Sequence, residues 1–220
     1  FFHPDPTVKR KTGFLQPKMN KSKILDTSIN IPYYFMIDNN KDFTFNPTFS
    51  EIGTNFFQGE YRQKNINSSH ILDLGFTNNF KSNYTTKKKN IFHFFSKSEI
   101  DLKYNNFDES RLKFYVEKTN KDTYLKIFES QLLNNNVKPK DSNVLTSGID
   151  FNLSNENILF ETGFTSYEDL NKAQNDRYQY ILPYYRFDSE LFSNELGRLN
   201  LVSTGTNILK NTNNLRTRII

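Results

Sequence analysis

The side chains that most often carry chemistry are few and scattered in this sequence. The three histidines, His3, His70 and His93, have no partner at the spacing that a metal site requires. There is no cysteine, which excludes a disulfide, a thiolate ligand or a thiol nucleophile within these 220 residues. Glycine-rich phosphate loops and nucleophile–base arrangements are also missing from the sequence. We therefore expect a protein that is not an enzyme, with no metal and no cofactor.

Two basic runs, residues 9–11 and 87–89, could attract anions. The net charge of +5 and the pI of about 9.1 fit acidic lipid headgroups, nucleic acid or neither. The second run lies between strand-like segments and is expected to be a solvated loop. Basic and aromatic residues interleave at 111–115, as in surfaces that bind single strands, but acidic residues are interspersed and no nucleic-acid motif occurs. We expect no nucleic-acid partner.

The elements that would position any site read as strands. Phe (22 residues) and Tyr (12) suit pleated surfaces, whereas the helix former Ala occurs only as Ala173. Residues 1–21 look irregular, and residues 166–176 look like a loop with a short helical turn opened by Ser166. The strand-like runs are 24–37, 42–50, 53–63, 69–78, 90–104, 110–118, 122–132, 143–153, 157–165, 177–188, 196–208 and 214–220.

Many runs alternate with a period of two, so that each strand has one apolar and one polar face. In the run 42–50, Phe43, Phe45 and Phe49 oppose Asp42 and Thr44. Such faces fit either a soluble sandwich, with apolar faces packed together, or a membrane barrel, with apolar faces toward lipid. Several runs reach ten or more residues, which is longer than ordinary soluble strands and close to the roughly 9–11 that cross a membrane.

Run length therefore favours an all-β, antiparallel transmembrane β-barrel. No stretch approaches the roughly 18 apolar residues of a membrane-spanning helix. Because neither end of the sequence coincides with a natural boundary of the pattern, we expect an internal fragment that holds the N-terminal part of a larger barrel.

Four ordered motifs support this reading. The first is the segment Lys9-Arg10-Lys11-Thr12-Gly13-Phe14-Leu15-Gln16-Pro17, and the second is Ile31-Pro32-Tyr33-Tyr34-Phe35. The third runs from Asn40 through Asp42 and Thr44 to Pro47, and the fourth is Glu60-Tyr61-Arg62. In this order they resemble the LptD family of lipopolysaccharide-assembly barrels, whose members carry R-[RK]-T-G-F-L-x-P, P-Y-Y-[FW], N-x-D-x-T-x-x-P and E-[FY]-R.

The resemblance implies how the chain is divided and what it meets. Residues 1–21 would be the linker from a periplasmic jelly-roll domain, and residues 22–220 the first part of the barrel in the outer membrane of a Gram-negative cell. The cargo would be lipopolysaccharide. The partners would be an LptE-like lipoprotein plug and an LptA-like periplasmic bridge that reaches the barrel through the jelly roll. The alternatives are another outer-membrane barrel, such as a porin or receptor, and a soluble β-sandwich binding module.

The two prolines Pro17 and Pro32 are the candidate site. Proline donates no hydrogen bond to a ladder, so each leaves a gap in the pairing of the first two segments. The resemblance implies a lateral seam there, through which the lipid leaves. Alternatively, Pro17 merely ends the linker and Pro32 marks a bulge. The basic run 9–11 would contact acidic phosphates of the lipid or act as a solvated hinge, with backbone freedom from Gly13.

Overall fold

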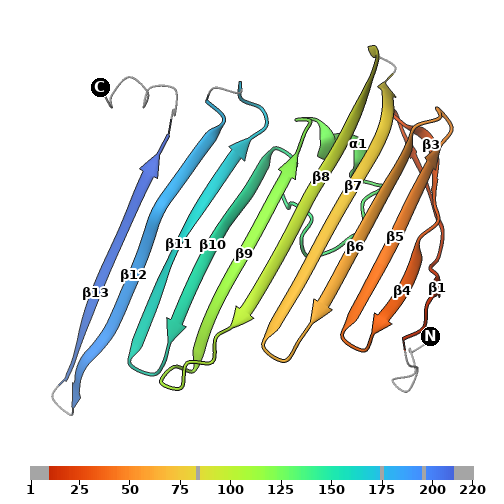
Figure 1. Cartoon of the computed structure of the whole chain (residues 1–220). Coiled ribbons are helices and arrows are strands. Elements are labelled where there is room, and N and C mark those ends of the chain that lie inside the picture. The colour runs from red at the N-terminus through yellow and green to blue at the C-terminus, as the bar shows by residue number, and fades with distance from the viewer. Residues whose placement is uncertain (1–9, 83–84, 174–175, 195–196, 211–220) are drawn as a thin grey trace.

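The computed structural model describes residues 10–82, 85–173, 176–194 and 197–210. These residues form one antiparallel sheet of 13 strands and a single short helix (Figure 1). The fold is therefore all-β, as predicted, and within the described residues the sheet is open and does not close on itself. The strands are β1 Gly13–Phe14, β2 Lys18–Ser22, β3 Asp26–Asn30, β4 Tyr33–Asp38, β5 Lys41–Ser50, β6 Asn55–Lys64, β7 Ser68–Ser82, β8 Thr85–Asp101, β9 Glu109–Thr119, β10 Val144–Ser154, β11 Ile158–Asp169, β12 Tyr178–Asn194 and β13 Gly197–Leu209.

From β5 onward the sheet is a simple meander in which each strand pairs with the next. The four short strands before β5 are the halves of two interrupted strands. β1 and β2 form the first strand of the sheet, β3 and β4 form the second, and β5 is the third. β3 and β4 both pair with β5, β2 pairs with β3, and β1 pairs with β4. The expected run 24–37 is thus split, because Pro32 lies between its halves. Strand pairing also begins at Gly13, inside the segment that the sequence predicted to be irregular.

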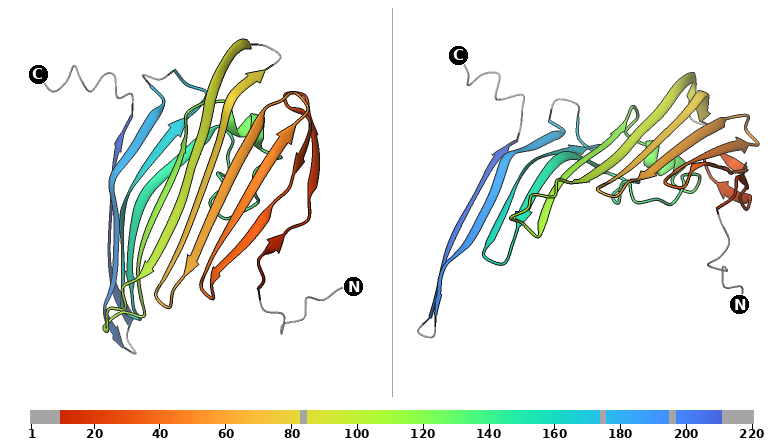
Figure 2. Two further views of the ribbon diagram at one scale, coloured as in Figure 1. Left: turned by 45° about the vertical axis from the view of Figure 1, so that its right-hand side comes forward. Right: turned by 60° about the horizontal axis from the view of Figure 1, so that its bottom comes forward.

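The sheet is curved, and its polar face is the one that is covered. Along β5, the side chains of Asp42, Thr44, Asn46 and Thr48 are 1–4% exposed, whereas Phe49 on the other face is 42% exposed. The curvature of the sheet is visible in Figure 2. Along β5 the concave face carries these buried polar side chains, whereas the convex face carries exposed aromatic and aliphatic side chains such as Phe49, Leu74 and Phe76. This distribution is the reverse of a soluble sandwich, in which apolar faces pack against each other.

The concave face of β3 to β8 is covered by the segment between β9 and β10, residues 120–143, which we call the insert (Figures 1 and 2). The insert contains the helix α1, Tyr124–Phe128. The predicted strand 122–132 is therefore wrong. Its apolar residues fall at 124, 125, 127, 128 and 132, which is helical spacing, and they pack onto strands instead of joining them. No helix in the described parts of the chain is long and apolar enough to cross a membrane.

A small apolar core joins the insert to the strands beneath it. The ring of Phe128 is fully buried and stacks on Phe56, with 4.8 Å between ring centroids, while Phe80 lies 5.9 Å away. The predicted loop with a helical turn at 166–176 begins too early: it is wrong for residues 166–169, whereas residues 170–173 do form a turn outside the strands, in which Lys172 N donates to Asp169 O at 3.2 Å. Residues 166–169 continue β11, because their backbones pair with β10 as far as Val144 and Asp169.

Candidate functional site

The interruptions in the first two strands lie side by side, and the hydrogen bonds around them show what each proline removes. Leu15 N donates to Pro32 O at 2.9 Å, so residues 15 and 32 face each other as a hydrogen-bonded pair. In such a pair the two residues normally exchange two hydrogen bonds. Pro32 has no N–H, so the bond back to the Leu15 carbonyl is missing. Only half of this pair is formed.

The next pair inward is also half-formed. Ile31 N donates to Pro47 O at 3.1 Å, and Pro47 has no N–H to return the bond. Pro32 therefore weakens the contact between the first and second strands, and Pro47 weakens the contact between the second and third. Between Phe14↔Tyr33 and Lys18↔Asn30 the first strand also has one residue more than the second, and Pro17 lies in this irregular stretch. We call these two half-formed pairs and Pro17 the seam.

The segment 10–15 runs along the edge of the sheet into the seam. Arg10 Nη1 bonds to Asp42 Oδ2 at 3.2 Å, and the Thr12 hydroxyl accepts from Met36 N at 2.9 Å. The Phe14 ring packs edge-on against Tyr33, with centroids 4.8 Å apart, and remains 74% exposed. Gly13 has no positive φ, and a Cβ there would have nothing within 4 Å. The structure thus gives no steric reason for glycine at this position, and Lys9 lies outside the described residues.

Several residues predicted from the motifs meet at one cavity on the concave face. It has a volume of about 930 Å³ and lies between the seam and the insert. Its walls include Arg10, Lys11 and Leu15 from the first segment, with Tyr34, Asp42 and Thr44 from the early-strand motifs. By contrast, Phe35 is 40% exposed and is not part of this cavity. Residues 133–134 of the insert also contribute to the walls.

The insert is held on the concave face by buried hydrogen bonds that span the seam. The backbone carbonyl of Gln131 accepts from Asn30 Nδ2 and from Asn46 Nδ2, each at 3.1 Å. Asn30 directly precedes Ile31, and Asn46 directly precedes Pro47. One carbonyl of the insert therefore joins the second and third strands beside the pair that Pro47 leaves half-formed.

Further hydrogen bonds extend from this point toward β8. Gln58 Nε2 donates to Asp73, His93 Nε2 lies 3.0 Å from Asp73 Oδ1, and the other ring nitrogen contacts the Tyr124 hydroxyl. Burial raises the pKa of Tyr124 well above its usual value, so this hydroxyl keeps its proton and can donate to His93 Nδ1. The His93 ring lies directly over Gly75, where a Cβ would come within 2.3 Å of it. Glycine is required there.

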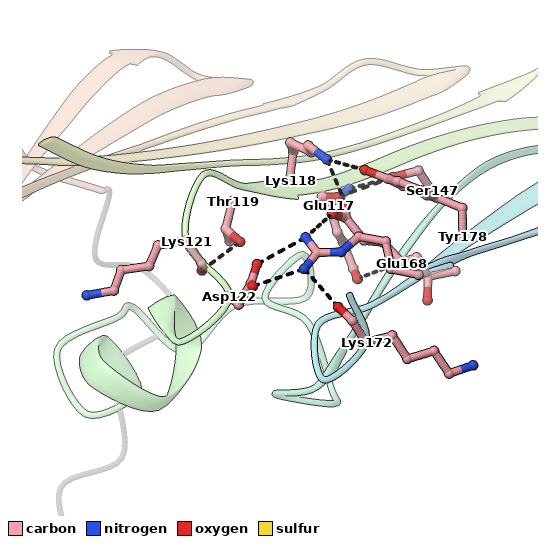
Figure 3. Close-up of polar contacts among 11 residues, drawn as sticks. Glu117, Lys118, Thr119, Lys121, Asp122, Ser147, Glu168, Lys172 and Tyr178 are labelled. Carbon is pink, nitrogen blue, oxygen red and sulfur yellow. Dashed lines mark hydrogen bonds and ion pairs between the residues drawn. The ribbon is translucent and has the colours of Figure 1, made fainter. Parts of the chain in front are cut away.

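The base of the insert is fixed by a second group of charges (Figure 3). The Arg177 guanidinium bonds to both carboxylate oxygens of Asp122, at 3.0 and 2.9 Å, and to Glu168 at 3.2 Å. The hydrogen bonds to Asp122 are the main cause that raises the pKa of Arg177, so the residue stays charged. Lys118 adds a 2.6 Å bond to Glu168. This group ties the start of the insert to β11 and the residue before β12.

Sequence reasoning found the prolines and the early-strand motifs but missed the insert and its anchors. Gln131 and Asn30 are 101 positions apart, and Arg177 and Asp122 are 55 apart. No local pattern links such residues. The one usable signal was the helical spacing of apolar residues in 124–132. Within the described part of the chain no cluster of three or more His, Cys, Asp or Glu could hold a metal ion.

Comparison with known proteins gives a distant relationship. No family model matches the chain. It is similar to the LPS-assembly protein LptD of Idiomarina loihiensis, with 32% identity over 124 residues. The match covers 55% of this chain and only 15% of that protein, so the chain spans a small part of its relative's length. An all-β sheet with a distant LptD-like relationship is what the fold and the sequence together establish.

Proposed function

We propose that this chain is part of an outer-membrane β-barrel that assembles lipopolysaccharide at the surface of a Gram-negative cell, and that the lipid leaves through the seam. The observation that carries the proposal is the side-by-side weakening of the first ladders at Pro32 and Pro47, in a sheet whose convex face is apolar. The similarity to LptD supports the choice of cargo.

The physical argument starts from the surroundings of the sheet. Apolar side chains on the convex face would meet hydrocarbon, and the polar concave face would line the barrel interior. In hydrocarbon, water cannot replace a missing backbone hydrogen bond, so a membrane barrel normally pairs every strand fully. Each half-formed pair therefore costs free energy. That two of them lie side by side supports a function for the weak pairing. Weak pairing at one place lets strands part there while the rest of the barrel stays intact.

Under this proposal the remaining parts have defined roles. An upstream jelly-roll domain would deliver the cargo from an LptA-like bridge, and residues 10–15 would guide the chain from that domain into the barrel. An LptE-like lipoprotein would occupy the interior of the complete barrel. The chain carries out no covalent chemistry and needs no cofactor, because it conducts a lipid and does not transform one.

The test is to replace Pro32 and Pro47 with threonine in the full-length protein and to deplete the wild-type copy. Threonine supplies an N–H and suits strands, so the double variant should pair more tightly at the seam. We expect surface lipopolysaccharide, labelled on intact cells, to fall although the barrel still shows heat-modifiable gel migration. A folded double variant that supports normal surface lipopolysaccharide would contradict the role of the seam. Normal surface lipopolysaccharide after depletion of the protein itself would refute the function.

A further inference from the structure

We propose that a groove on the convex face, across β6, β7 and β8, binds an acyl chain of a phosphate-bearing glycolipid in the leaflet around the protein, with Lys118 beside its phosphate. The groove has a volume of about 360 Å³, and five apolar side chains form its walls: Phe57, Leu74, Phe76, Phe92 and Phe94. This inference rests on the proposed function, which places the convex face in hydrocarbon. It concerns lipid that is already in the leaflet and not cargo inside the barrel.

The strand register explains why a groove forms here. Phe57 pairs with Phe76, and Phe76 pairs with Phe92, so these three rings form one row across β6, β7 and β8. Leu74 pairs with Phe94 and forms a second row, two residues further along each strand. Residues two apart in a strand lie on the same face, so both rows stand on the convex side of the sheet. They are the two walls of the groove.

The floor between the rows is backbone. Gly75 and His93 pair with each other there and line the groove. Gly75 has no side chain, and the His93 side chain lies on the concave face, where it bonds to Asp73 and Tyr124. Both residues therefore leave the convex side open. The groove is a consequence of the register and spans the roughly 10 Å from β6 to β8.

An acyl chain is the occupant that matches these walls. Leu74, Phe76 and Phe92 are 44–45% exposed, and the described residues that line the groove include no Asp, Glu, Lys or Arg. Because dispersion contacts add up with the number of touching atoms, a chain held between two rows gains more contact than a chain on a smooth face. The groove should therefore retain one hydrocarbon chain longer than the neighbouring surface does.

The second row of the groove leads to a cation. Phe94 pairs with Lys118 on β9, so Lys118 lies on the convex face beside the groove. β9 ends one residue later, at the end of the sheet opposite to the one where residues 10–15 enter (Figure 1). Under the proposed function this end lies at the outer surface of the membrane, where the phosphates of the glycolipid are found. A chain in the groove would thus have its headgroup near Lys118.

The surroundings of Lys118 fit the level of lipid headgroups. Its side chain is 47% exposed and donates to Glu168 at 2.6 Å and to the Tyr178 hydroxyl at 3.1 Å (Figure 3). Glu168 is also bonded to Arg177 at 3.2 Å, so Lys118 is not its only cation and can attract a further anion. Tyr178 stacks on Tyr180, and aromatic side chains mark the membrane interfaces of barrels.

The test maps where lipids touch the full-length protein in phosphatidylcholine nanodiscs. The probe is lipid A with two phosphates and a photoreactive diazirine on one acyl chain, added at a trace level. The comparison probes are the same lipid A without its phosphates, and phosphatidylglycerol with the same diazirine. Cross-linked peptides are counted by mass spectrometry as the ratio of those from β6–β8 to those from β10–β12.

Three variants test the walls and the cation. Leu74→Trp fills the groove, and Lys118→Gln removes the charge beside it. The matched control is Ile149→Trp, at an aliphatic side chain of β10 that is 38% exposed and lies outside the groove. Heat-modifiable gel migration shows that each variant is folded.

We expect the ratio for wild-type protein to be about fivefold higher with the phosphorylated lipid A than with the dephosphorylated one, because a lysine near a surface phosphate contributes roughly this factor. Lys118→Gln should make the two probes equal. Leu74→Trp should lower the ratio for both, whereas Ile149→Trp should leave it unchanged.

An even spread of cross-links from the phosphorylated lipid A would overturn the proposal, and so would equal ratios for Leu74→Trp and Ile149→Trp. A ratio for phosphatidylglycerol equal to that of the phosphorylated lipid A would overturn the assignment to a glycolipid. These results are separate from the test of function. Even cross-linking in a protein on which surface lipopolysaccharide depends would reject the groove alone, and enriched cross-linking in a protein whose depletion leaves surface lipopolysaccharide unchanged would reject the function alone.

Discussion

The two ends of the sheet are held together in different ways. From β8 to β11 the ladders are long and have no register shift, as in the eleven-residue pairing of β10 with β11. At the other end, β1 pairs with β4 through Gly13 and Phe14 only, and β3 pairs with β5 through residues 28–30. Backbone hydrogen bonds thus hold the continuous end, whereas the seam end lacks two of them at prolines.

The seam end is held in place by contacts other than backbone pairing. The insert adds side-chain hydrogen bonds and a small apolar core on the concave side, and the Gln131 carbonyl joins the second and third strands. Side-chain contacts to a loop can be released more easily than a backbone ladder. Under the proposed function, this arrangement would keep the seam end ordered at rest and let its strands part, and the following predictions test this contrast.

The largest expected effect is on the docking of the insert. Phe128→Ala removes a fully buried ring and should destabilise the docked insert by about 3–5 kcal/mol. Hydrogen exchange of the backbone amides at 124–133 should accelerate, while exchange at residues 148–154 of β10, beyond the core residue Leu145, stays unchanged. The control is Ile66→Ala, at a side chain that is 96% exposed. Equal acceleration in β10 would mean that the insert and the continuous end unfold together, against the contrast drawn above.

The next effect concerns the base of the insert. Arg177→Met leaves Glu168, which is 8% exposed, and Asp122, which is 51% exposed, without their shared cation. Removing one partner of a buried ion pair costs about 3–5 kcal/mol, but Glu168 keeps its bond to Lys118 and Asp122 is exposed, which reduces the cost to about 2 kcal/mol. Faster proteolysis within residues 129–143 would report it. Arg186→Met, in an exposed pair with Asp188, should change the proteolysis rate little, and similar rates in the two variants would refute the anchor.

Replacing either Pro32 or Pro47 should strengthen only the strand pair in which that proline lies. Pro32→Thr adds an N–H directed at Leu15, and Pro47→Thr adds one directed at Ile31. Each new bond should stabilise its pair by about 1 kcal/mol. The Leu15 amide should exchange roughly fivefold more slowly in the first variant, and the Ile31 amide in the second. Protection of the same amide by both substitutions would show that the two pairs are not independent.

The smallest effect is a gain in stability. The side-chain amide of Gln131 is buried and has no hydrogen-bond partner among the described residues. The contact between the second and third strands is made by the backbone carbonyl of this residue, which accepts from Asn30 and Asn46. Gln131→Met keeps the shape of the side chain and removes the unpaired polar atoms, so it should stabilise the insert by up to about 1 kcal/mol. Slower exchange at 124–133 is the expected result. Faster exchange would mean that the Gln131 amide makes a contact that matters to the docked state.

Much of this arrangement could be predicted from the sequence, and what could not has a physical reason. The alternation of Phe43 and Phe45 with Asp42 and Thr44 defined the two faces of β5, because a strand repeats every two residues. Pro32 predicted a break, because proline cannot donate to a ladder. The half-formed pair at Pro47 needed the register, which brings Pro47 opposite Ile31. The insert's contacts needed the fold, because they join residues far apart in the chain.

The most direct test of the central claim is the environment of the β5 side chains in the full-length protein in native membranes. This segment has no native cysteine, so a single cysteine at each position from 42 to 49 can be spin-labelled after replacement of any cysteine elsewhere in the full-length protein. We expect labels at positions 43, 45, 47 and 49 to collide with dissolved oxygen in the lipid, and labels at 42, 44, 46 and 48 to be shielded from it. Shielding at all eight positions, with no alternation, would contradict the claim that the convex face meets hydrocarbon.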